Sequence, residues 1–326
     1  MHDFDYVTPK GLGEASALLR KHGPRAALKA GGVDLVDLMK EGIAAPSVVV
    51  NLLSLPGLAA ISEDPEKGLA IGSLVTLDAI ATHPAVTARY PVLARAAGEA
   101  ATPQIRNVAT LGGNLCQRPR CWYFRSADFH CLKKGGDTCF AVEGDNRYHA
   151  IFGDGPCHIV SPSSTGLALV ALGGSVDVVG ENGERSVPAE TFFSMPDKDI
   201  ARENTLASGE IVRGARIPPP EKGTVSSYLK IREKEAFDWP IAEAAVVMTK
   251  DGAGVVRAAR VTLGAVAPVP WRASGAEKAL IGRPVGEKAA AEAAAAALAG
   301  AKPMSGNRYK VALLEEVVRR AILQAR

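Results

Sequence analysis

The stretch Arg106-Asn-Val-Ala-Thr-Leu-Gly-Gly-Asn-Leu115 carries most of the information about the fold of this chain. Pro103 before it and the pair Gly112-Gly113 within it end the helical pattern of residues 92–101, which predicts a loop. A second glycine pair lies in Ala30-Gly-Gly-Val-Asp-Leu35, between an apolar run and an expected helix. Glycines let backbone N–H groups approach a phosphate, and the start of a helix favours its negative charge. Either loop alone could be a plain turn, but together they could clasp the two phosphates of a dinucleotide.

Length and composition limit the classes of protein to consider. The chain has 326 residues, of which 47% are hydrophobic and 22% charged, as in a globular protein of about two domains. A net charge of +3 does not favour a nucleic-acid or membrane-surface partner, and no apolar run approaches the roughly 18 residues that span a bilayer. The N-terminal residues lack the basic and apolar regions of a signal peptide. We therefore expect either a cytoplasmic location or export to the periplasm together with a partner.

Hydrophobic periodicity predicts an α+β fold. The run Pro218-Pro-Pro-Glu-Lys-Gly223 is the best candidate boundary, and we expect one domain over residues 1–219 and a second over 223–326. Strands are predicted at residues 47–52, 69–76, 224–231, 242–249 and 254–266. Helices are predicted at residues 12–22, 77–82, 92–101, 289–298 and 311–323, with a turn and helix over 28–39 and a mixture of helix and strand over 168–179.

All five cysteines fall within residues 116–157, here called the cysteine segment. The segment has little periodicity, and irregular segments of this length inside a domain are usually functional. Structural zinc sites usually use close C-x2–4-C pairs, which this segment lacks. Disulfides are also an alternative if the protein is exported, although the number of cysteines is odd. His130, His149, His158 and Trp239-Pro240 belong to no recognisable catalytic pattern, and we interpret the histidines as polar loop residues.

Five motifs, in this order, resemble the FAD-binding medium subunits of the molybdenum hydroxylases, the xanthine dehydrogenase and carbon monoxide dehydrogenase group. They are Ala30-Gly-Gly-Val-Asp-Leu35, Leu69-Ala-Ile-Gly-Ser73, Arg106 to Leu115, Leu167-Ala-Leu-Val-Ala-Leu172 and Tyr228-Leu-Lys-Ile-Arg232. The resemblance implies a two-part FAD-binding domain of the vanillyl-alcohol-oxidase (PCMH) type, followed by a small C-terminal domain of sheet and helices. The residues it places at FAD are Leu28, Lys29, Ala30, Gly31, Gly32, Val33, Asp34, Leu35, Thr102, Ala109, Thr110, Gly112, Gly113, Asn114, Ser164 and Lys230.

The cysteine segment resembles the insert of a subset of this family that carries an additional [4Fe–4S] cluster. Bacterial periplasmic aldehyde oxidoreductases have such an insert, and 4-hydroxybenzoyl-CoA reductases have an analogous one. A cubane cluster needs four thiolates. The likeness assigns them to Cys121, Cys131, Cys139 and Cys157, spaced C-x9-C-x7-C-x17-C, and leaves Cys116 as a buried apolar residue. Nearby basic residues would offset the charge of the cluster; they are Arg118, Arg120, Arg125, Lys133 and Lys134.

The resemblance therefore implies an electron-transfer subunit of a heterotrimeric molybdenum-containing aldehyde oxidoreductase. Its partners would be a large molybdenum-cofactor subunit and a small [2Fe–2S] subunit, with no nucleic acid and no membrane involved. FAD would pass the electrons to an external acceptor. Two alternatives remain open. The chain could be the β subunit of an enzyme like 4-hydroxybenzoyl-CoA reductase, or a binding protein without redox function whose cysteine segment is stabilised by zinc or by disulfides.

Overall fold

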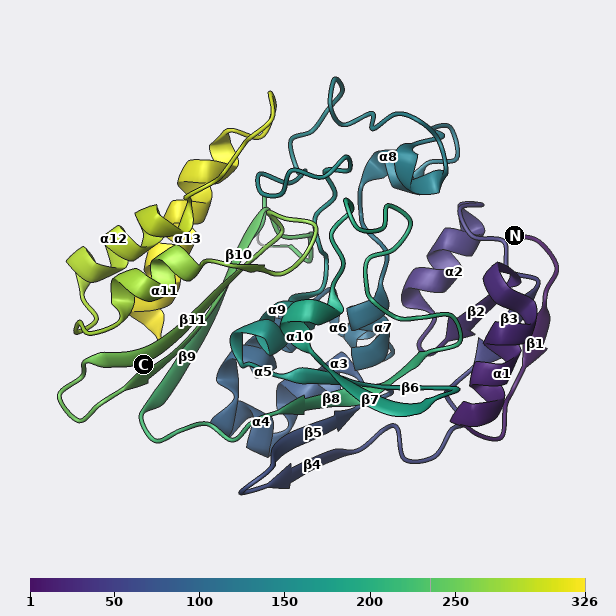
Figure 1. Ribbon diagram of the computed structural model, residues 1–326, viewed down its shortest axis with the longest axis horizontal. Coiled ribbons are helices and arrows are strands. Elements are labelled where there is room, and N and C mark those ends of the chain that lie inside the picture. The colour runs from purple at the N-terminus through teal and green to yellow at the C-terminus, as the bar shows by residue number, and fades with distance from the viewer. Residues whose placement is uncertain (235, 326) are drawn as a thin grey trace.

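The computed structural model describes residues 1–234 and 236–325, which form three β-sheets with helices around them (Figure 1). The first sheet is small and parallel, with the strand order β1-β3-β2. Parallel strands need crossover connections, which two helices and a short 3-10 turn supply. The elements are β1 (Asp5–Val7), α1 (Leu12–His22), η1 (Gly23–Arg25), β2 (Ala26–Lys29), α2 (Val33–Lys40) and β3 (Val48–Asn51).

The second sheet is antiparallel and has the strand order β4-β5-β8-β6-β7. Helices α5 and α9 share a core with its strands β5, β6 and β8. The strands are β4 (Ile61–Asp64), β5 (Gly68–Gly72), β6 (Ser175–Gly180), β7 (Gly183–Pro188) and β8 (Ile211–Ile217). The helices are α3 (Leu77–Thr82), α4 (Pro84–Arg89), α5 (Pro91–Gly98), α6 (Pro103–Arg106), α7 (Leu111–Cys116), α9 (Ser164–Ala171) and α10 (Ala189–Phe192).

The third sheet is antiparallel, with the order β12-β11-β10-β9, and it is covered on both faces. Along β10, Ala245 joins the core that contains α5 and α9, whereas Ala244 and Val246 join the core formed with the C-terminal helices. This explains why β10 is apolar almost throughout rather than alternating with polar residues. The elements are β9 (Thr224–Ile231), β10 (Ala242–Lys250), β11 (Val256–Gly264), β12 (Trp271–Arg272), α11 (Ser274–Leu280), α12 (Glu287–Ala297) and α13 (Tyr309–Gln324).

The cysteine segment continues the chain after α7 and contains only two short turns of helix among its described residues. These are α8 (Trp122–Arg125) and η2 (Leu132–Lys134). Figure 1 shows α8 and the loops around it above the sheets, between α2 and the C-terminal helices. The segment therefore bridges the first sheet and the third.

The α+β class is confirmed, and most predicted elements are present. The clearest difference is at residues 69–76, where the strand β5 ends at Gly72 because the following residues turn toward α3. Sequence patterns did not predict the strands β1, β2, β4, β7 and β8 or the helices α4, α10 and α11. The stretch predicted as a loop after residue 101 also contains the short helices α6 and α7. The exposed face of β7 is polar, with only Val187 buried, so its apolar alternation is too short to detect. In the described part of the chain, we find no helix that is long and apolar enough to cross a membrane.

Candidate functional site

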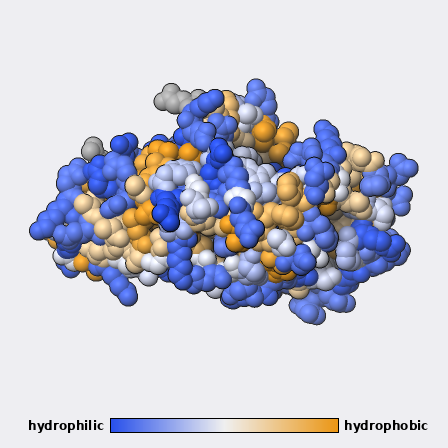
Figure 2. Space-filling model, turned by 90° about the horizontal axis from the view of Figure 1, so that it is seen from above, coloured by the Kyte–Doolittle hydropathy of each residue, from blue (hydrophilic) through white to orange (hydrophobic). Residues whose placement is uncertain are grey.

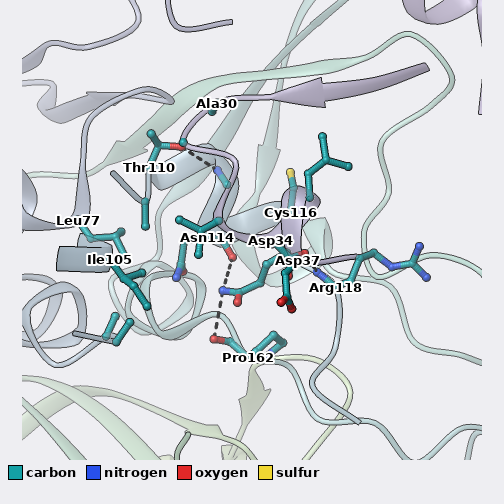
Figure 3. A pocket seen from close by; sticks show the side chains of 18 of the residues that line it. Ala30, Asp34, Asp37, Leu77, Ile105, Thr110, Asn114, Cys116, Arg118 and Pro162 are labelled. Atoms are coloured by element: carbon teal, nitrogen blue, oxygen red, sulfur yellow. Dashed lines mark hydrogen bonds between the residues drawn. The ribbon is translucent and has the colours of Figure 1, made fainter. Parts of the chain in front are cut away.

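A cavity of about 570 Å³ lies where the start of α2, helix α7 and strand β9 meet (Figure 3). Its volume is in the range of cofactor sites, roughly 300–1,000 Å³. Both glycine loops line it, as do Ser164 and Lys230. Of the predicted FAD residues, Thr102 and Gly112 are not among the described lining residues. The tertiary structure thus brings together side chains from distant parts of the sequence.

The two glycine loops touch each other directly. A Cβ atom at Gly31 would overlap the backbone carbonyl of Val108, which precedes the second loop. Gly32 has a φ of 78°, a left-handed conformation that glycine adopts without strain. The close contact therefore requires glycine at Gly31, and the left-handed conformation favours glycine at Gly32. The backbones of the two loops form one continuous wall of the cavity.

The second loop is held in place by the turn after β5. The N–H of Leu77 donates to the carbonyl of Ala109 (2.9 Å), and the N–H of Gly112 donates to the carbonyl of Ser73 (2.8 Å). Gly112 thus lies against Ser73, outside the cavity lining. Thr102 has a similar structural role, because its hydroxyl accepts from the N–H of Ile105 (3.3 Å) and caps α6.

Thr110 and Asn114 organise the cavity from the second loop. The Thr110 hydroxyl accepts from the N–H of Gly113 (3.2 Å) and caps α7. The Oδ1 atom of Asn114 accepts from the hydroxyls of Ser163 (2.9 Å) and Thr165 (2.6 Å). Asn114 therefore fixes the loop before α9, which places Ser164 at the cavity.

Lys230 lines the cavity on the side of β9, next to a group of buried polar side chains. Lys230 donates to the carbonyl of Glu99 (3.0 Å), and burial lowers its pKa. Burial raises the pKa of Glu243, which lies opposite Lys230 in the β9–β10 register. The buried hydroxyl of Tyr228 lies beside Ser164 and Glu243 and is not among the residues that line the cavity. Of these polar side chains, Lys230 and Ser164 face the cavity, and we call them its floor.

Asp34 joins the rim of the cavity to the cysteine segment. Its carboxylate pairs with the guanidinium groups of Arg120 (2.8 Å) and Arg125 (2.6 Å), and it accepts from the backbone N–H of Arg118 (2.8 Å). The Arg120 guanidinium also lies 4.4 Å from the ring centre of Trp239. Burial lowers the pKa of Arg120 to about 10. The start of the cysteine segment is therefore attached to the first turn of α2.

Four of the five cysteines gather beside this rim. Cys121 lies near Cys131 and Cys139, and Cys139 lies beside Cys157. The interaction with Cys157 lowers the pKa of Cys139 to about 5, and the interaction with Cys139 raises the pKa of Cys157. Burial raises the pKa of Cys121 to about 11. The fold thus places near one another the four cysteines that the family resemblance had grouped.

The surroundings of these cysteines are apolar and aromatic. Cys121 and Cys131 pack with Phe124, Phe140 and Leu38. All five cysteines are unpaired, so the structure contains no disulfide among them. Among residues 1–234 and 236–325, no group of three His, Cys, Asp or Glu side chains is arranged to hold a single metal ion. A cubane cluster differs from a single-ion site because each of its four irons takes its own thiolate.

Cys116 stands apart from the other four. It lines the cavity at the end of α7 and packs against the core of the second sheet. Burial raises its pKa to about 12. Cys116 packs as an apolar residue, but its side chain is half-buried and faces the cavity, so the expectation of full burial was wrong.

Comparison with known proteins identifies the family. Residues 2–220 match the family model described as the FAD-binding domain in molybdopterin dehydrogenase, and residues 227–325 match the C-terminal domain of CO dehydrogenase flavoproteins. The aldehyde oxidoreductase FAD-binding subunit PaoB of Escherichia coli (strain K12) is 33% identical, over 100% of this chain and 99% of the relative. The carbon monoxide dehydrogenase medium chain of Hydrogenophaga pseudoflava is 31% identical, over 98% of this chain and 96% of the relative.

Solved structures agree with this result. A chain of carbon monoxide dehydrogenase from Hydrogenophaga pseudoflava aligns with a TM-score of 0.78 at 31% identity, covering 99% of this chain and 97% of that one. A chain of quinoline 2-oxidoreductase from Pseudomonas putida 86 aligns with a TM-score of 0.77. The chain is a FAD-binding medium subunit of the molybdenum hydroxylase family. It is therefore a subunit of an oxidoreductase.

Several residues of this medium subunit that form its sites had no recognisable motif in the sequence. Gln117, Arg118, Arg120 and Trp239 line the cavity, and His149 contacts Cys121. The basic residues of the cysteine segment form ion pairs that the sequence did not predict. Arg118 and Lys133 pair with Glu203, whereas Arg120 and Arg125 pair with Asp34. These ion pairs attach the segment to the rest of the subunit, and the role of the same charges beside a cluster stays a prediction.

The other end of the cysteine segment is attached through Lys310, which is fully buried at the start of α13. Its ammonium group donates to the carbonyls of Tyr148 (3.3 Å), His149 (3.1 Å) and Ala265 (2.6 Å). This single side chain of α13 connects the segment to Ala265, the residue that follows β11. We infer that it contributes strongly to the stability of the flavoprotein subunit.

The substitution Lys310→Met is expected to lower the free energy of unfolding by about 3 kcal/mol or more, because three buried carbonyls lose their donor. The matched control is Lys302→Met, since Lys302 forms an exposed ion pair with Asp154. That change should cost less than about 1 kcal/mol. Urea unfolding of both variants, followed by circular dichroism, measures the difference. Equal midpoints for the two variants would contradict the role given to Lys310.

Proposed function

We propose that this chain is the electron-transfer subunit, carrying FAD and a [4Fe–4S] cluster, of a heterotrimeric molybdenum-containing aldehyde oxidoreductase. The observation that supports it most is the gathering of four cysteines directly beside the FAD cavity. Arg120 lines the cavity and Cys121, the next residue, belongs to the cysteine group. The identity to an aldehyde oxidoreductase subunit over the whole chain favours an aldehyde as the substrate of the complex.

FAD would be held by the two glycine loops and the cavity floor. Backbone N–H groups of Gly31 and Gly32, at the start of α2, suit the pyrophosphate, because glycines allow close approach of the backbone. Lys230 and Ser164 supply polar groups on the other side of the cavity. When bound, FAD can transfer electrons either in pairs or one at a time, and the cluster transfers one electron at a time. The chain itself contributes binding, orientation and control of solvent access.

The cysteine group fits a cubane cluster by its chemistry. The four ligands would be Cys121, Cys131, Cys139 and Cys157. Cys131 and Cys157 are each 7% exposed, so water has little access to them. Aromatic side chains around the group, including Phe124 and Phe140, add a low-polarity environment that influences reduction potential.

The partners would be a large subunit with the molybdenum cofactor and a small subunit with [2Fe–2S] clusters. The face shown in Figure 2 carries hydrophobic residues in separate patches between hydrophilic ones. Two large exposed hydrophobic residues, Phe237 (59%) and Trp239 (50%), lie on the loop between β9 and β10, and Trp239 lines the cavity. We propose that FAD exchanges electrons with acceptors outside the subunit at this edge of the cavity.

The test is to produce the chain with its partner subunits and to assay cofactors and aldehyde-dependent reduction without oxygen. We expect about one FAD and four iron atoms per chain, with bleaching of the flavin when an aldehyde is added. No bleaching by an aldehyde, together with reoxidation of the chemically reduced flavin by 4-hydroxybenzoyl-CoA, would favour the 4-hydroxybenzoyl-CoA reductase alternative. Purified protein without iron would contradict the cluster, and purified protein without flavin would contradict the assignment of the cavity.

A further inference from the structure

The side chain of His149 contacts one of the four grouped cysteines. Its Nε2 atom lies 3.2 Å from the sulfur of Cys121, 28 residues earlier in the chain. His149 is 4% exposed and lies away from the FAD cavity lining. The function proposed above gives this residue no role, yet its contact with a cysteine sulfur is the kind that affects a metal cluster.

The backbone of His149 is fixed from several directions. Its N–H donates to the carbonyl of Asn146 (3.0 Å). Its carbonyl accepts from Nδ2 of Asn307 (3.1 Å) and from the ammonium group of Lys310 (3.1 Å). Asn146 is in turn held by the hydroxyl of Ser305 (3.1 Å). The start of α13 therefore sets the position from which the imidazole reaches Cys121.

Aromatic rings fix the imidazole itself. Its centre is 5.5 Å from the ring centre of Trp122 and 6.0 Å from that of Tyr123, the two residues that follow Cys121. The Nδ1 atom is buried and has no hydrogen-bond partner among the described residues. The Cys121 sulfur is thus the polar group that the ring contacts.

The protonation of the ring follows from this environment. A hydrogen bond between Nε2 and the Cys121 sulfur, which lie 3.2 Å apart, needs a proton on one of these two atoms. A cysteine sulfur bound to iron has lost its proton and can only accept a hydrogen bond. In the presence of the cluster, the ring proton therefore belongs on Nε2, where it faces the sulfur.

We propose that His149 is a positioning residue whose Nε2–H donates a hydrogen bond to the Cys121 sulfur and thereby raises the reduction potential of the cluster. A hydrogen bond to a ligand sulfur stabilises the reduced cluster, which carries more negative charge. Asn307 and Lys310 hold the donor in place. This inference rests on the proposed [4Fe–4S] cluster and adds a residue that controls its potential.

The test compares His149→Phe with His149→Gln in the assembled complex. Phenylalanine keeps an aromatic ring but has no donor, whereas glutamine places an amide N–H at a reach similar to that of Nε2. The measurements are iron per chain and the midpoint potential of the cluster from a redox titration followed by electron paramagnetic resonance. His130→Phe is the matched control, because His130 also adjoins a grouped cysteine but is exposed.

We expect His149→Phe to keep its iron and to shift the midpoint to lower potential, with His149→Gln close to the unsubstituted protein and His130→Phe unchanged. An unchanged midpoint potential in an iron-loaded His149→Phe protein would overturn the role of His149 without affecting the proposal of the cluster. If His149→Phe loses iron, retention of iron by His149→Gln supports the hydrogen bond, and loss of iron in both variants overturns the role of His149. Absence of iron from the unsubstituted protein would overturn the proposal of the cluster and, with it, this inference.

Discussion

Serine at any one of the four grouped cysteines is expected to lower the iron content from about four atoms per chain to less than one. The affected residues are Cys121, Cys131, Cys139 and Cys157. A serine hydroxyl is a much poorer iron ligand than a thiolate, and a cluster with one weak ligand exposes its iron to solvent. Iron and acid-labile sulfide assays of the purified complex give the result. The FAD content of the same samples shows whether the subunit remains folded.

Cys116→Ser provides the control for these four variants. Cys116 lines the cavity that we assign to FAD and is not part of the cysteine group, so this variant should keep its full iron content. Loss of iron in Cys116→Ser together with retention in Cys121→Ser would show that the ligand assignment is wrong. Stoichiometric zinc in place of iron would instead support the stapled, non-redox alternative.

Gly31→Ala is expected to weaken FAD binding by roughly ten- to a hundredfold. The added Cβ would overlap the Val108 carbonyl, so the two glycine loops must move apart. Forcing an atom into a packed contact costs about 1–3 kcal/mol, and the displaced backbone is the wall proposed to hold the pyrophosphate. Fluorescence titration of the flavin-depleted complex with FAD measures the effect.

The matched control for Gly31→Ala is Gly13→Ala. Gly13 is exposed in α1, and a Cβ there meets no atom within 4 Å. Alanine favours helix over glycine by about 1 kcal/mol, so this variant should bind FAD normally and be slightly more stable. Unchanged FAD affinity in Gly31→Ala would show that close contact of the two loops is not needed for binding.

The amino-acid sequence by itself was sufficient to predict the family and the α+β class, and it singled out the two sets of residues to which we assign the FAD and cluster sites. The reason is that both sets are local signals. A pair such as Gly31-Gly32 marks backbone that must approach closely or adopt positive φ, which only glycine does freely. The cysteines could be grouped because their chemistry is rare and they lie within one segment of 42 residues, from Cys116 to Cys157.

Tertiary structure alone decided which distant residues complete these sites. Trp239 stacks on Arg120, and Lys310 reaches a carbonyl 161 residues earlier in the chain. Gly112 belongs to a glycine loop by sequence, yet it lies against Ser73 rather than in the cavity. A sequence pattern shows which side of a helix or strand is buried, but it does not show which partner covers that side. The contact between His149 and Cys121 depends on how α13 packs against the cysteine segment, so only the folded chain reveals it.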